Sequence, residues 1–176
     1  DEIRSRGLGD VYKRQIHLEP SMDSMFREIV RHIKIYVLDT LKFKDMFNYS
    51  ITKTWISRTR DTKEIPYHIH STSHVSFVYY LNIPPYSHTT KFIDIENYNS
   101  LFLGANSQHT VDDLNMVKEF TPLNSKSFFL HPVEGHVVLF PSRLTHGTEC
   151  IKKDFTGERL SLSLIHISEP TRPYLI

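Results

Sequence analysis

Two histidines one residue apart, His68 and His70, are the side chains of this sequence best placed to do chemistry together. In an extended segment, residues i and i+2 point to the same face, so both rings would lie on one side, roughly 6.5–7 Å apart at Cα. A third histidine from a distant segment, such as His146, would complete a three-point face for one metal ion and leave the opposite positions open for substrates. Arg159, on a later predicted strand, carries a planar fork of donors suited to a carboxylate. The alternative is that the pair consists of ordinary solvent-facing strand histidines.

The composition is that of a single folded domain. The chain has 176 residues, of which 39% are hydrophobic and 12% aromatic, enough for a buried core. A formal charge of +1 provides no strong attraction to nucleic acid or to an anionic membrane, so we expect neither as a partner. The single cysteine excludes an internal disulfide and is typical of a reducing compartment, which predicts a cytoplasmic protein. No apolar run approaches the ~18–20 residues of a membrane span.

Both ends of the chain differ in pattern from the rest. Residues 1–15 and 164–176 show no helical or strand periodicity, and they resemble peptides produced when sequencing-adapter DNA is translated as coding sequence. We therefore expect artefactual tails with little regular structure and few buried side chains, on a natural protein that is longer at both ends. The alternative is that they are genuine flexible tails. On this interpretation, residues 16–163 form the domain.

The remaining residues predict one helix followed by strands. Ser21–Phe43 starts with capping residues and carries apolar residues at helical spacing, so it should pack against a sheet. Strand-like runs follow at Ser50–Ser57, His74–Asn82, Lys91–Ile95, Ser127–Leu130, Gly135–Phe140, His146–Ile151 and Arg159–Leu164. One helix and then strands without helical crossovers predict a mainly β fold, an antiparallel sandwich or jelly roll. We interpret Tyr98–Lys126 as an insertion with a short helix at Val111–Phe120, of the kind that often shapes a substrate mouth.

Three blocks of residues carry a resemblance to a known family. Residues 68–81 align with the pattern H-x-H-P-x-S-x-x-S-G-V-Y-Y-L, residues 135–146 with G-x-L-V-L-F-P-S-x-L-x-H, and residues 159–163 with R-I-S-I-S. Together, and in this order, they resemble the 2-oxoglutarate/Fe(II)-dependent oxygenases of a prolyl-hydroxylase-like group that is common in phage and marine metagenomes. The resemblance covers about residues 51–163. It implies a double-stranded β-helix, ferrous iron as cofactor and 2-oxoglutarate as cosubstrate, with a further substrate that the motifs do not name.

The same resemblance implies roles for individual residues. His68 and His146 would bind iron, together with His70, which stands where the wider superfamily usually has an aspartate or glutamate. Arg159 would bind the distal carboxylate of 2-oxoglutarate, and Ser161, on the same strand face, would add a hydroxyl donor. Tyr80 is a further candidate to donate its hydroxyl to this carboxylate, the alternative being a core aromatic. For Arg159 the alternative is a surface ion pair with a neighbouring acid.

The sequence departs from the motifs at two positions, and two functions other than that of a 2-oxoglutarate-dependent oxygenase stay open. Ser71 replaces the usual proline, and Phe77 replaces a glycine, which either narrows the cavity or fills the other face of the sheet. Three imidazoles also suit zinc, copper or nickel. The other functions are a cupin-like metal-binding module without oxygenase activity and a three-histidine dioxygenase that does not use 2-oxoglutarate. The orientation of Arg159 discriminates among them, because an arginine buried beside the metal site favours the 2-oxoglutarate enzyme.

Overall fold

The structure is a computed structural model that describes residues 2–3, 10–12, 15–93, 118–119 and 127–170, with side chains for 15–93, 118–119 and 127–163. Two 3-10 turns, η1 (Ile16–Leu18) and η2 (Pro20–Met22), precede helix α1 (Asp23–Ile35), which a π-helical turn, η3 (Tyr36–Thr40), continues. Lys42 then adopts the left-handed conformation, with φ 60°, soon after the helix ends. The predicted helix is therefore confirmed, although it ends before Phe43.

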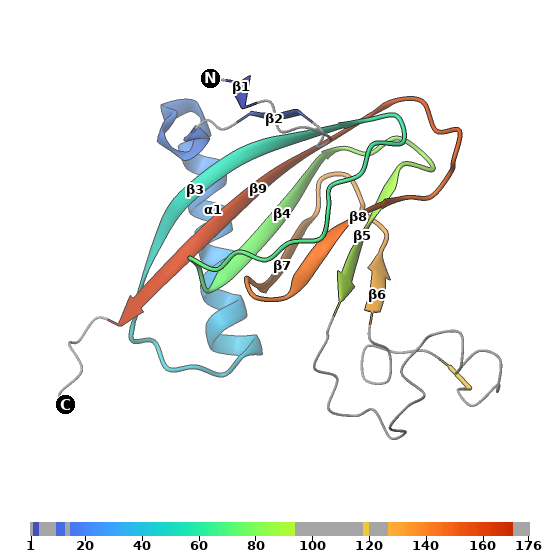
Figure 1. Cartoon of the computed structure of the whole chain (residues 1–176). Helices are drawn as coiled ribbons and strands as arrows, with labels where there is room; N and C mark the ends of the chain where they lie inside the picture. Colours follow the sequence, from blue (N-terminus) through green and yellow to red (C-terminus); the bar gives the residue numbers. More distant parts are fainter. Residues whose placement is uncertain (1, 4–9, 13–14, 94–117, 120–126, 171–176) are drawn as a thin grey trace.

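The strands form two antiparallel sheets (Figure 1). Their bounds are β1 Glu2–Ile3, β2 Asp10–Tyr12, β3 Phe47–Arg60, β4 Val75–Asn82, β5 His88–Ile93, β6 Ser127–Leu130, β7 Val137–Pro141, β8 Thr145–Cys150 and β9 Glu158–Pro170. The larger sheet has the order β1-β2-β3-β9-β4-β7, and the smaller has the order β6-β5-β8. The chain crosses between the sheets from β4 to β5 and from β7 to β8. This is the predicted jelly roll, a double-stranded β-helix.

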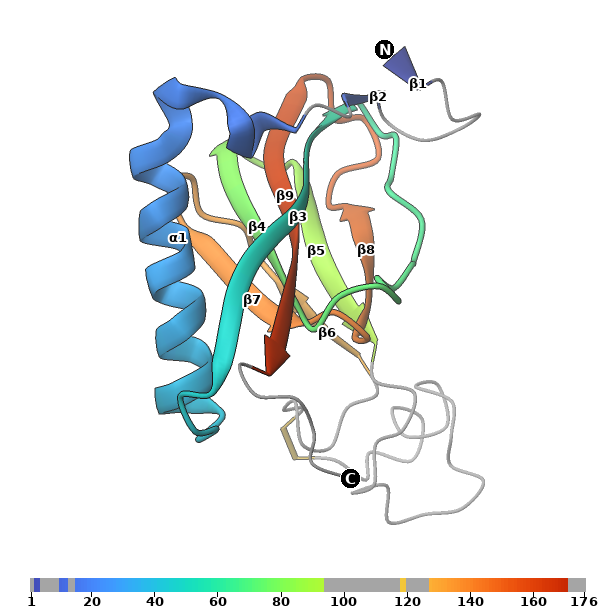
Figure 2. The same ribbon diagram turned by 90° about the vertical axis from the view of Figure 1, so that its left-hand side faces the viewer.

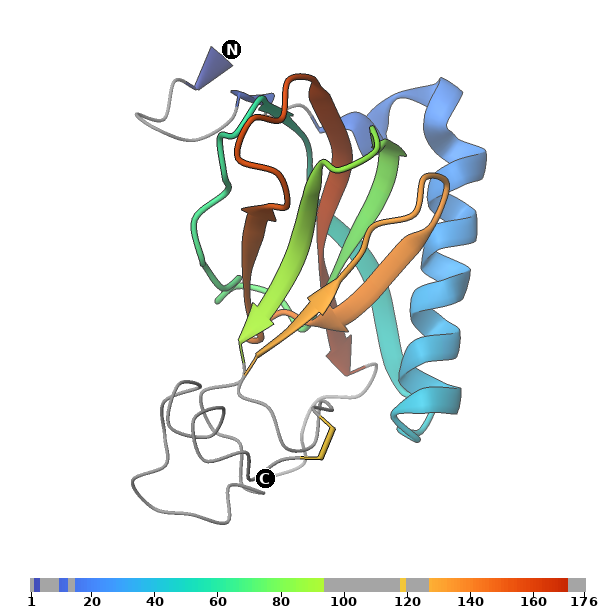
Figure 3. The same cartoon turned by 90° about the vertical axis from the view of Figure 1, so that its right-hand side faces the viewer.

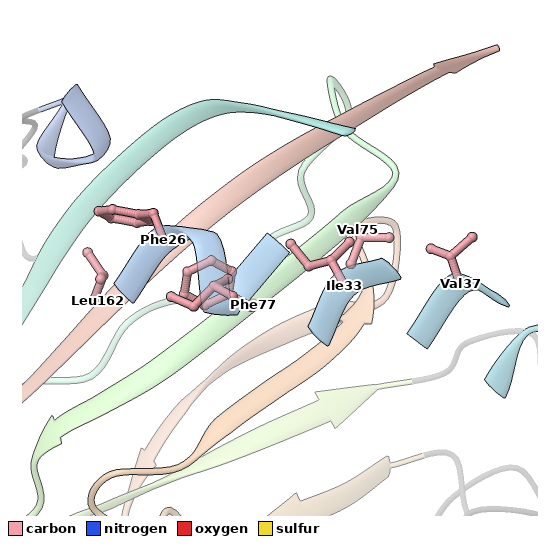
Figure 4. Packing of buried hydrophobic residues seen from close by; sticks show 7 residues of the cluster. Phe26, Ile33, Val37, Val75, Phe77 and Leu162 are labelled. Atoms are coloured by element: carbon pink, nitrogen blue, oxygen red, sulfur yellow. The ribbon is translucent and has the colours of Figure 1, made fainter. Parts of the chain in front are cut away.

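Helix α1 covers the outer face of the larger sheet (Figure 2). Its buried residues recur at helical spacing, so that they lie on one stripe that faces the sheet. Figure 4 shows the stripe above the outward-pointing residues of β4 and β9; the labelled side chains are Phe26, Ile33, Val37, Val75, Phe77 and Leu162. Phe77 thus packs on the outer face beneath the helix, which is how the chain accommodates a phenylalanine where the motif has glycine, although the residue also borders the cavity between the sheets.

The inner face of the larger sheet is turned toward the smaller sheet (Figure 3). Alternation along β4 sends Ser76, Val78 and Tyr80 inward, opposite in direction to the helix-facing Phe77. Val78 and Tyr80 pack with Phe92 from β5 in a second hydrophobic cluster. These side chains form an apolar boundary of the space between the sheets. Polar residues on neighbouring strands also point into this space.

The predicted strands all appear, with ends that differ by a few residues. The largest difference is at β9, which we expected to end near Leu164 but which continues to Pro170. Its backbone pairs with β3 as far as Phe47↔Pro170 and with β4 as far as Val75↔His166. The expectation of little regular structure after Leu164 is therefore wrong for these residues, because the long partner strand β3 offers a continuous edge to pair with. Short strands β1 and β2 likewise lie within the expected tail 1–15.

The predicted insertion Tyr98–Lys126 and its short helix lie outside the described residues, apart from Lys118 and Glu119, which form a bend. No helix in the described part of the chain is both long and apolar enough to cross a membrane.

Candidate metal centre and cosubstrate pocket

The structure brings His68, His70 and His146 together. One ring nitrogen of each lies within 4.8 Å of those of the other two, and the ring centroids are 4.9 Å, 4.4 Å and 5.0 Å apart for the pairs 68–70, 68–146 and 70–146. This spacing is close to the 3–4.5 Å we expect for three ligands of one ion, bound at about 2.0–2.2 Å each. In the described part of the chain, this is the one group of three or more His, Cys, Asp or Glu residues that could hold a metal ion.

Backbone pairing to strand β8 holds His68 beside His146. The two residues exchange both backbone hydrogen bonds, each with an N···O distance of 3.0 Å. A second pair of hydrogen bonds joins Ile65 to Thr148. The Ile65 amide donates to the Thr148 hydroxyl at 2.7 Å, and the Thr148 amide donates to the Ile65 carbonyl at 3.0 Å. Gly147 lies between these contacts, and a Cβ there would come within 2.9 Å of the Ile65 carbonyl oxygen. The glycine thus permits the close approach of this segment to β8.

Carbonyl groups fix the tautomers of two of the histidines. The Nδ1 of His68 lies 2.8 Å from the carbonyl oxygen of Pro66, and that of His146 lies 2.8 Å from the carbonyl oxygen of Leu144. Because a carbonyl only accepts, each Nδ1 carries the hydrogen and each Nε2 keeps a free lone pair. Metal-binding histidines are commonly oriented in this way. The ring of His70 instead contacts the edge of Trp55, with centroids 5.4 Å apart.

Burial keeps two of these imidazoles neutral. It lowers the pKa of His70 to about 3, an effect that the nearby rings of His146 and then His68 strengthen. Burial also lowers the pKa of His146 to about 4, although the hydrogen bond to the Leu144 carbonyl opposes the change. A metal ligand must be the neutral imidazole. Near neutral pH, both side chains are therefore in the form that binds a metal.

Arg159 lies inside the barrel, as predicted. It is 1% exposed, and its Nη1 donates to the Ser161 hydroxyl at 3.3 Å, while its Nε has no partner in the described structure. Burial lowers the pKa of the guanidinium below its ordinary value, but arginine stays protonated in proteins. The alternative of a surface ion pair is excluded by this burial. A buried cation without an acidic partner is costly, and an anion bound beside it would remove that cost.

The predicted strand alternation of β9 is confirmed as far as its side chains are described. Arg159, Ser161 and Ser163 all line the cavity, whereas Leu162 packs under the helix. Ser163 of β9 is paired with Trp55 of β3, and the Trp55 ring contacts the His70 ring. The end of the cavity that contains the histidines therefore lies beside Ser163. Arg159 is four residues earlier, about 13 Å along the strand. The guanidinium therefore lies toward the opposite end of the cavity from the histidines.

Tyr80 is buried beside Arg159, and its hydroxyl already has a partner. The Arg159 Cζ is 5.4 Å from the centre of the tyrosine ring, and the Tyr80 hydroxyl lies 2.9 Å from the Thr90 hydroxyl. Thr90 lines the cavity, and the sequence gave no reason to select it. The role of Tyr80 as a direct cosubstrate contact stays a prediction; the structure places its ring against Arg159 and its hydroxyl on Thr90.

One cavity of about 300 Å³ is lined by the three histidines together with Arg159, Ser161 and Thr90, whereas Tyr80 is not among its lining residues. Its polar lining includes the three histidines and Arg159, and its apolar wall near the histidines includes Trp55. No aspartate or glutamate of the described residues lines it. Sequence reasoning also missed the remaining side chains of this wall and its hydroxyl groups, which are Ser57, Ile65, Pro66, Val78, Phe140 and Thr148.

Comparison with known proteins identifies the family. The profile of the family described as "Putative 2OG-Fe(II) oxygenase" matches residues 53–164, which is more than half of the chain. The chain belongs to this family. Its members are 2-oxoglutarate-dependent oxygenases, so the protein is an oxidoreductase with Fe(II) as cofactor and 2-oxoglutarate as cosubstrate, and the resemblance seen in the three motifs is confirmed. No curated protein matches the sequence.

Solved structures of 2OG-Fe(II) oxygenases share the fold of this family member. An oxidoreductase of the 2OG-Fe(II) oxygenase family from Burkholderia pseudomallei is 12% identical with a TM-score of 0.58, over 95% of this chain and 71% of that one. A prolyl-4-hydroxylase from Pseudomonas putida is 13% identical with a TM-score of 0.53, over 95% and 78%. A viral collagen prolyl hydroxylase from Paramecium bursaria Chlorella virus 1, solved with 2-oxoglutarate, is 12% identical with a TM-score of 0.54, over 90% and 79%. At these identities, the likeness concerns the fold.

The side chains of this oxygenase fit the cofactor that its family uses. Three imidazole nitrogen donors on one side of a cavity suit a divalent transition metal and leave further coordination positions facing the cavity. The buried guanidinium of Arg159, with an unpartnered Nε, suits a carboxylate.

Proposed function

We propose that His68, His70 and His146 bind Fe(II) and that Arg159, with Ser161, binds the distal carboxylate of 2-oxoglutarate. One observation carries the proposal: three convergent imidazoles and a buried arginine, which has no acidic partner among the described residues, line the same cavity. This orientation of Arg159 favours an enzyme that uses 2-oxoglutarate over a cupin-like binding module and over a dioxygenase without this cosubstrate. Tyr80 lies against the Arg159 guanidinium, and its hydroxyl bonds to Thr90, so these two residues help to hold Arg159 in place.

The residues of the chain have separate tasks in the proposed reaction. When bound, Fe(II) and 2-oxoglutarate supply the oxidation, in which dioxygen gives one oxygen atom to the succinate formed with loss of carbon dioxide and one to a C–H bond of the substrate. Arg159 orients the cosubstrate, because a guanidinium fork fixes both the position and the plane of a carboxylate. The imidazoles of His70 and His146 stay neutral and, with that of His68, occupy one side of the cavity, and apolar side chains line the wall beside them.

The wall near the histidines indicates the kind of group that is oxidised. It is formed by apolar side chains, among them Trp55, Ile65 and Phe140, and no acidic side chain of the described residues lines the cavity. We therefore propose that the substrate presents an uncharged C–H-bearing group, since a charged one would be desolvated without a partner. Proline-containing peptides are the first substrates to test, because two of the similar structures are prolyl hydroxylases. We also propose that the protein acts in the cytoplasm.

Anaerobic titration of the metal-free protein with Fe(II) and then 2-oxoglutarate tests the proposal. We expect a weak visible charge-transfer band that appears only when both are present. In Arg159→Leu, the affinity for 2-oxoglutarate should fall at least about tenfold, because a charge-assisted contact to a buried group is lost, while Fe(II) binding is retained.

Arg143→Leu is the matched control, because Arg143 is an exposed arginine close in sequence to His146 that does not line the cavity. It should leave both affinities unchanged. Unchanged 2-oxoglutarate affinity in Arg159→Leu would remove Arg159 from the site. Fe(II) binding without any measurable 2-oxoglutarate binding in the wild type would contradict the assignment of the pocket to 2-oxoglutarate.

A further inference from the structure

Ser142 lies at the centre of a buried cluster of three hydroxyl groups. Its Oγ is 2.6 Å from that of Ser73 and 2.8 Å from that of Ser76. Ser142 and Ser76 are each 1% exposed, and Ser73 is 9% exposed. The three serines come from two distant parts of the chain: Ser73 and Ser76 lie between His70 and the first residues of β4, and Ser142 lies in the turn between β7 and β8. Their hydrogen bonds therefore connect these two parts inside the protein.

The backbone of Ser142 bonds to the same segment. Its carbonyl accepts from the His70 amide at 2.9 Å, and its amide donates to the His74 carbonyl at 3.0 Å. Ser142 is followed by Leu144, whose carbonyl orients the ring of His146. Ser142 thus bonds to His70 itself and to residues shortly after it, and it lies four positions before His146. The separation of these two histidines depends on where Ser142 is held.

His70 needs this support more than the other two histidines do. The rings of His68 and His146 are each oriented by a carbonyl at 2.8 Å, whereas the His70 ring makes no such bond within the described structure and contacts Trp55 instead. Its ring position is therefore set by packing and by the position of its own backbone. That backbone is bonded to Ser142.

We infer that Ser142 is a positioning residue for the metal centre, which holds His70 at binding distance from His146 through its bonds to Ser73 and Ser76. The inference rests on the proposed metal-binding role of the three histidines. It also gives a physical reason for the serines in the two histidine-containing motifs, since all three meet at one point. Loss of the Ser142 hydroxyl would leave two buried hydroxyl groups without their partner and would allow the two parts of the chain to shift.

The test is Co(II) binding to metal-free Ser142→Ala, followed by the visible absorption of the bound ion. We expect the affinity to fall about tenfold or more, in the range seen when groups that orient metal ligands are lost. The absorption spectrum should also change, because it reports the geometry of the ligands. A merely structural role would lower the unfolding temperature but would leave both the affinity and the spectrum of the folded protein unchanged.

Ser87→Ala is the matched control, since Ser87 is also buried, at 2% exposed, but lies before β5 and outside the cluster. It should leave Co(II) binding unchanged. Ser73→Ala should weaken binding less than Ser142→Ala, and the double variant should bind no worse than Ser142→Ala alone, because the two share one bond. Should Ser142→Ala fail to fold by circular dichroism, Ser73→Ala decides. Wild-type protein that does not bind Co(II) contradicts the proposed metal site, whereas unaltered binding and spectra in the variants contradict only the role of Ser142.

Discussion

His68 and His146 form an isolated antiparallel bridge, and the centroids of their rings are 4.4 Å apart. The bridge joins a segment without regular structure to strand β8, and it places two side chains of distant sequence on the same side of the cavity. The two backbone hydrogen bonds of the bridge hold the backbones together, and the carbonyls of Pro66 and Leu144 orient the two rings, so this arrangement does not require a metal ion. Preorganisation of this kind lowers the entropy lost on binding. The following predictions test this geometry and the charges around it.

Replacement of any one of the three histidines by alanine should reduce Fe(II) or Co(II) affinity by more than about 100-fold, because even groups that only orient metal ligands contribute 10–100-fold. His136→Ala is a close control. His136 is an exposed histidine whose Nδ1 lies 3.1 Å from the Glu134 carbonyl, and it is outside the cluster. Calorimetric titration of the metal-free variants gives the affinities. Full affinity in His70→Ala would leave a two-histidine site and remove His70 from it.

Gly147→Ala should displace the segment that carries His68. A Cβ at this position would meet the Ile65 carbonyl oxygen at 2.9 Å and the Tyr67 Cδ1 at 2.9 Å. We expect a loss of about 1–3 kcal/mol in the free energy of unfolding, as for other overpacked positions, together with weaker metal binding. Urea unfolding and metal titration measure the two effects.

Gly135→Asn is the control for Gly147→Ala. Gly135 has a φ of 78° with open space around its Cβ position, and asparagine tolerates this conformation. This variant should be almost as stable as the wild type. Wild-type stability of Gly147→Ala would show that the segment can move away from β8 without loss.

Arg159→Met should stabilise the protein in the absence of ligands. The Arg159 guanidinium is buried with one unpartnered nitrogen and no acidic partner among the described residues, and an apolar chain of similar size would avoid the cost of desolvating this charge. The unfolding temperature should therefore rise while 2-oxoglutarate binding is lost. The same change at exposed Arg143 should alter neither quantity. A lower unfolding temperature for Arg159→Met would mean that the arginine supports the fold rather than a ligand.

The metal-free protein should lose stability as the pH falls below about 6.5. The pKa of His70 is lowered to about 3 and that of His146 to about 4, so the unfolded chain takes up protons in this range before the folded protein does. Each histidine then reduces the free energy of unfolding by at most about 1.4 kcal/mol per pH unit, between its unfolded and folded pKa values. Acidic groups with lowered pKa values change stability in the same direction, so a comparison is needed.

The variant His70→Asn/His146→Asn isolates the contribution of the two histidines to this pH dependence. Urea unfolding at pH 7 and pH 5 in the presence of a chelator should show a loss for the wild type that is larger by roughly 2 kcal/mol or more than the loss for the variant. An equal loss in both proteins would mean that neither histidine is held neutral by the fold.

The convergence of the proposed metal and cosubstrate residues was predictable because each follows a local rule. His68 and His70, like Arg159 and Ser161, share a face through the period of two in an extended chain, and His146 came from a motif with fixed order. The Thr90–Tyr80 bond and the serine cluster were not predictable in the same way. Hydroxyl groups pair with whatever strand becomes their neighbour, and that neighbour is set by the topology and not by nearby sequence.

The length of β9 was missed for a related reason. Residues 164–170 have no strand pattern of their own, but they lie opposite β3, which runs for 14 residues and pairs with them from Phe47 onward. Backbone hydrogen bonds require no particular side chains, so a partner strand can extend a neighbour beyond the point where its pattern ends. The helix α1 shows the opposite case, since its spacing alone fixed the stripe that faces the sheet.

Fe(II) and 2-oxoglutarate should each strengthen the binding of the other. The cavity holds the neutral imidazoles of His70 and His146 and the cation Arg159, and no carboxylate of the described residues lines it, so a divalent metal adds charge of the same sign as Arg159. A dianion bound between the two positions would offset both. We expect saturating 2-oxoglutarate to raise the affinity for Mn(II) by about tenfold, a typical coupling between sites. By reciprocity, Mn(II) should raise the affinity for 2-oxoglutarate by the same factor. Calorimetric titrations in both orders measure the two factors, and Arg159→Leu should abolish the coupling while it retains Mn(II) binding. Equal Mn(II) affinity with and without 2-oxoglutarate would show that the charges of the pocket are balanced by other groups.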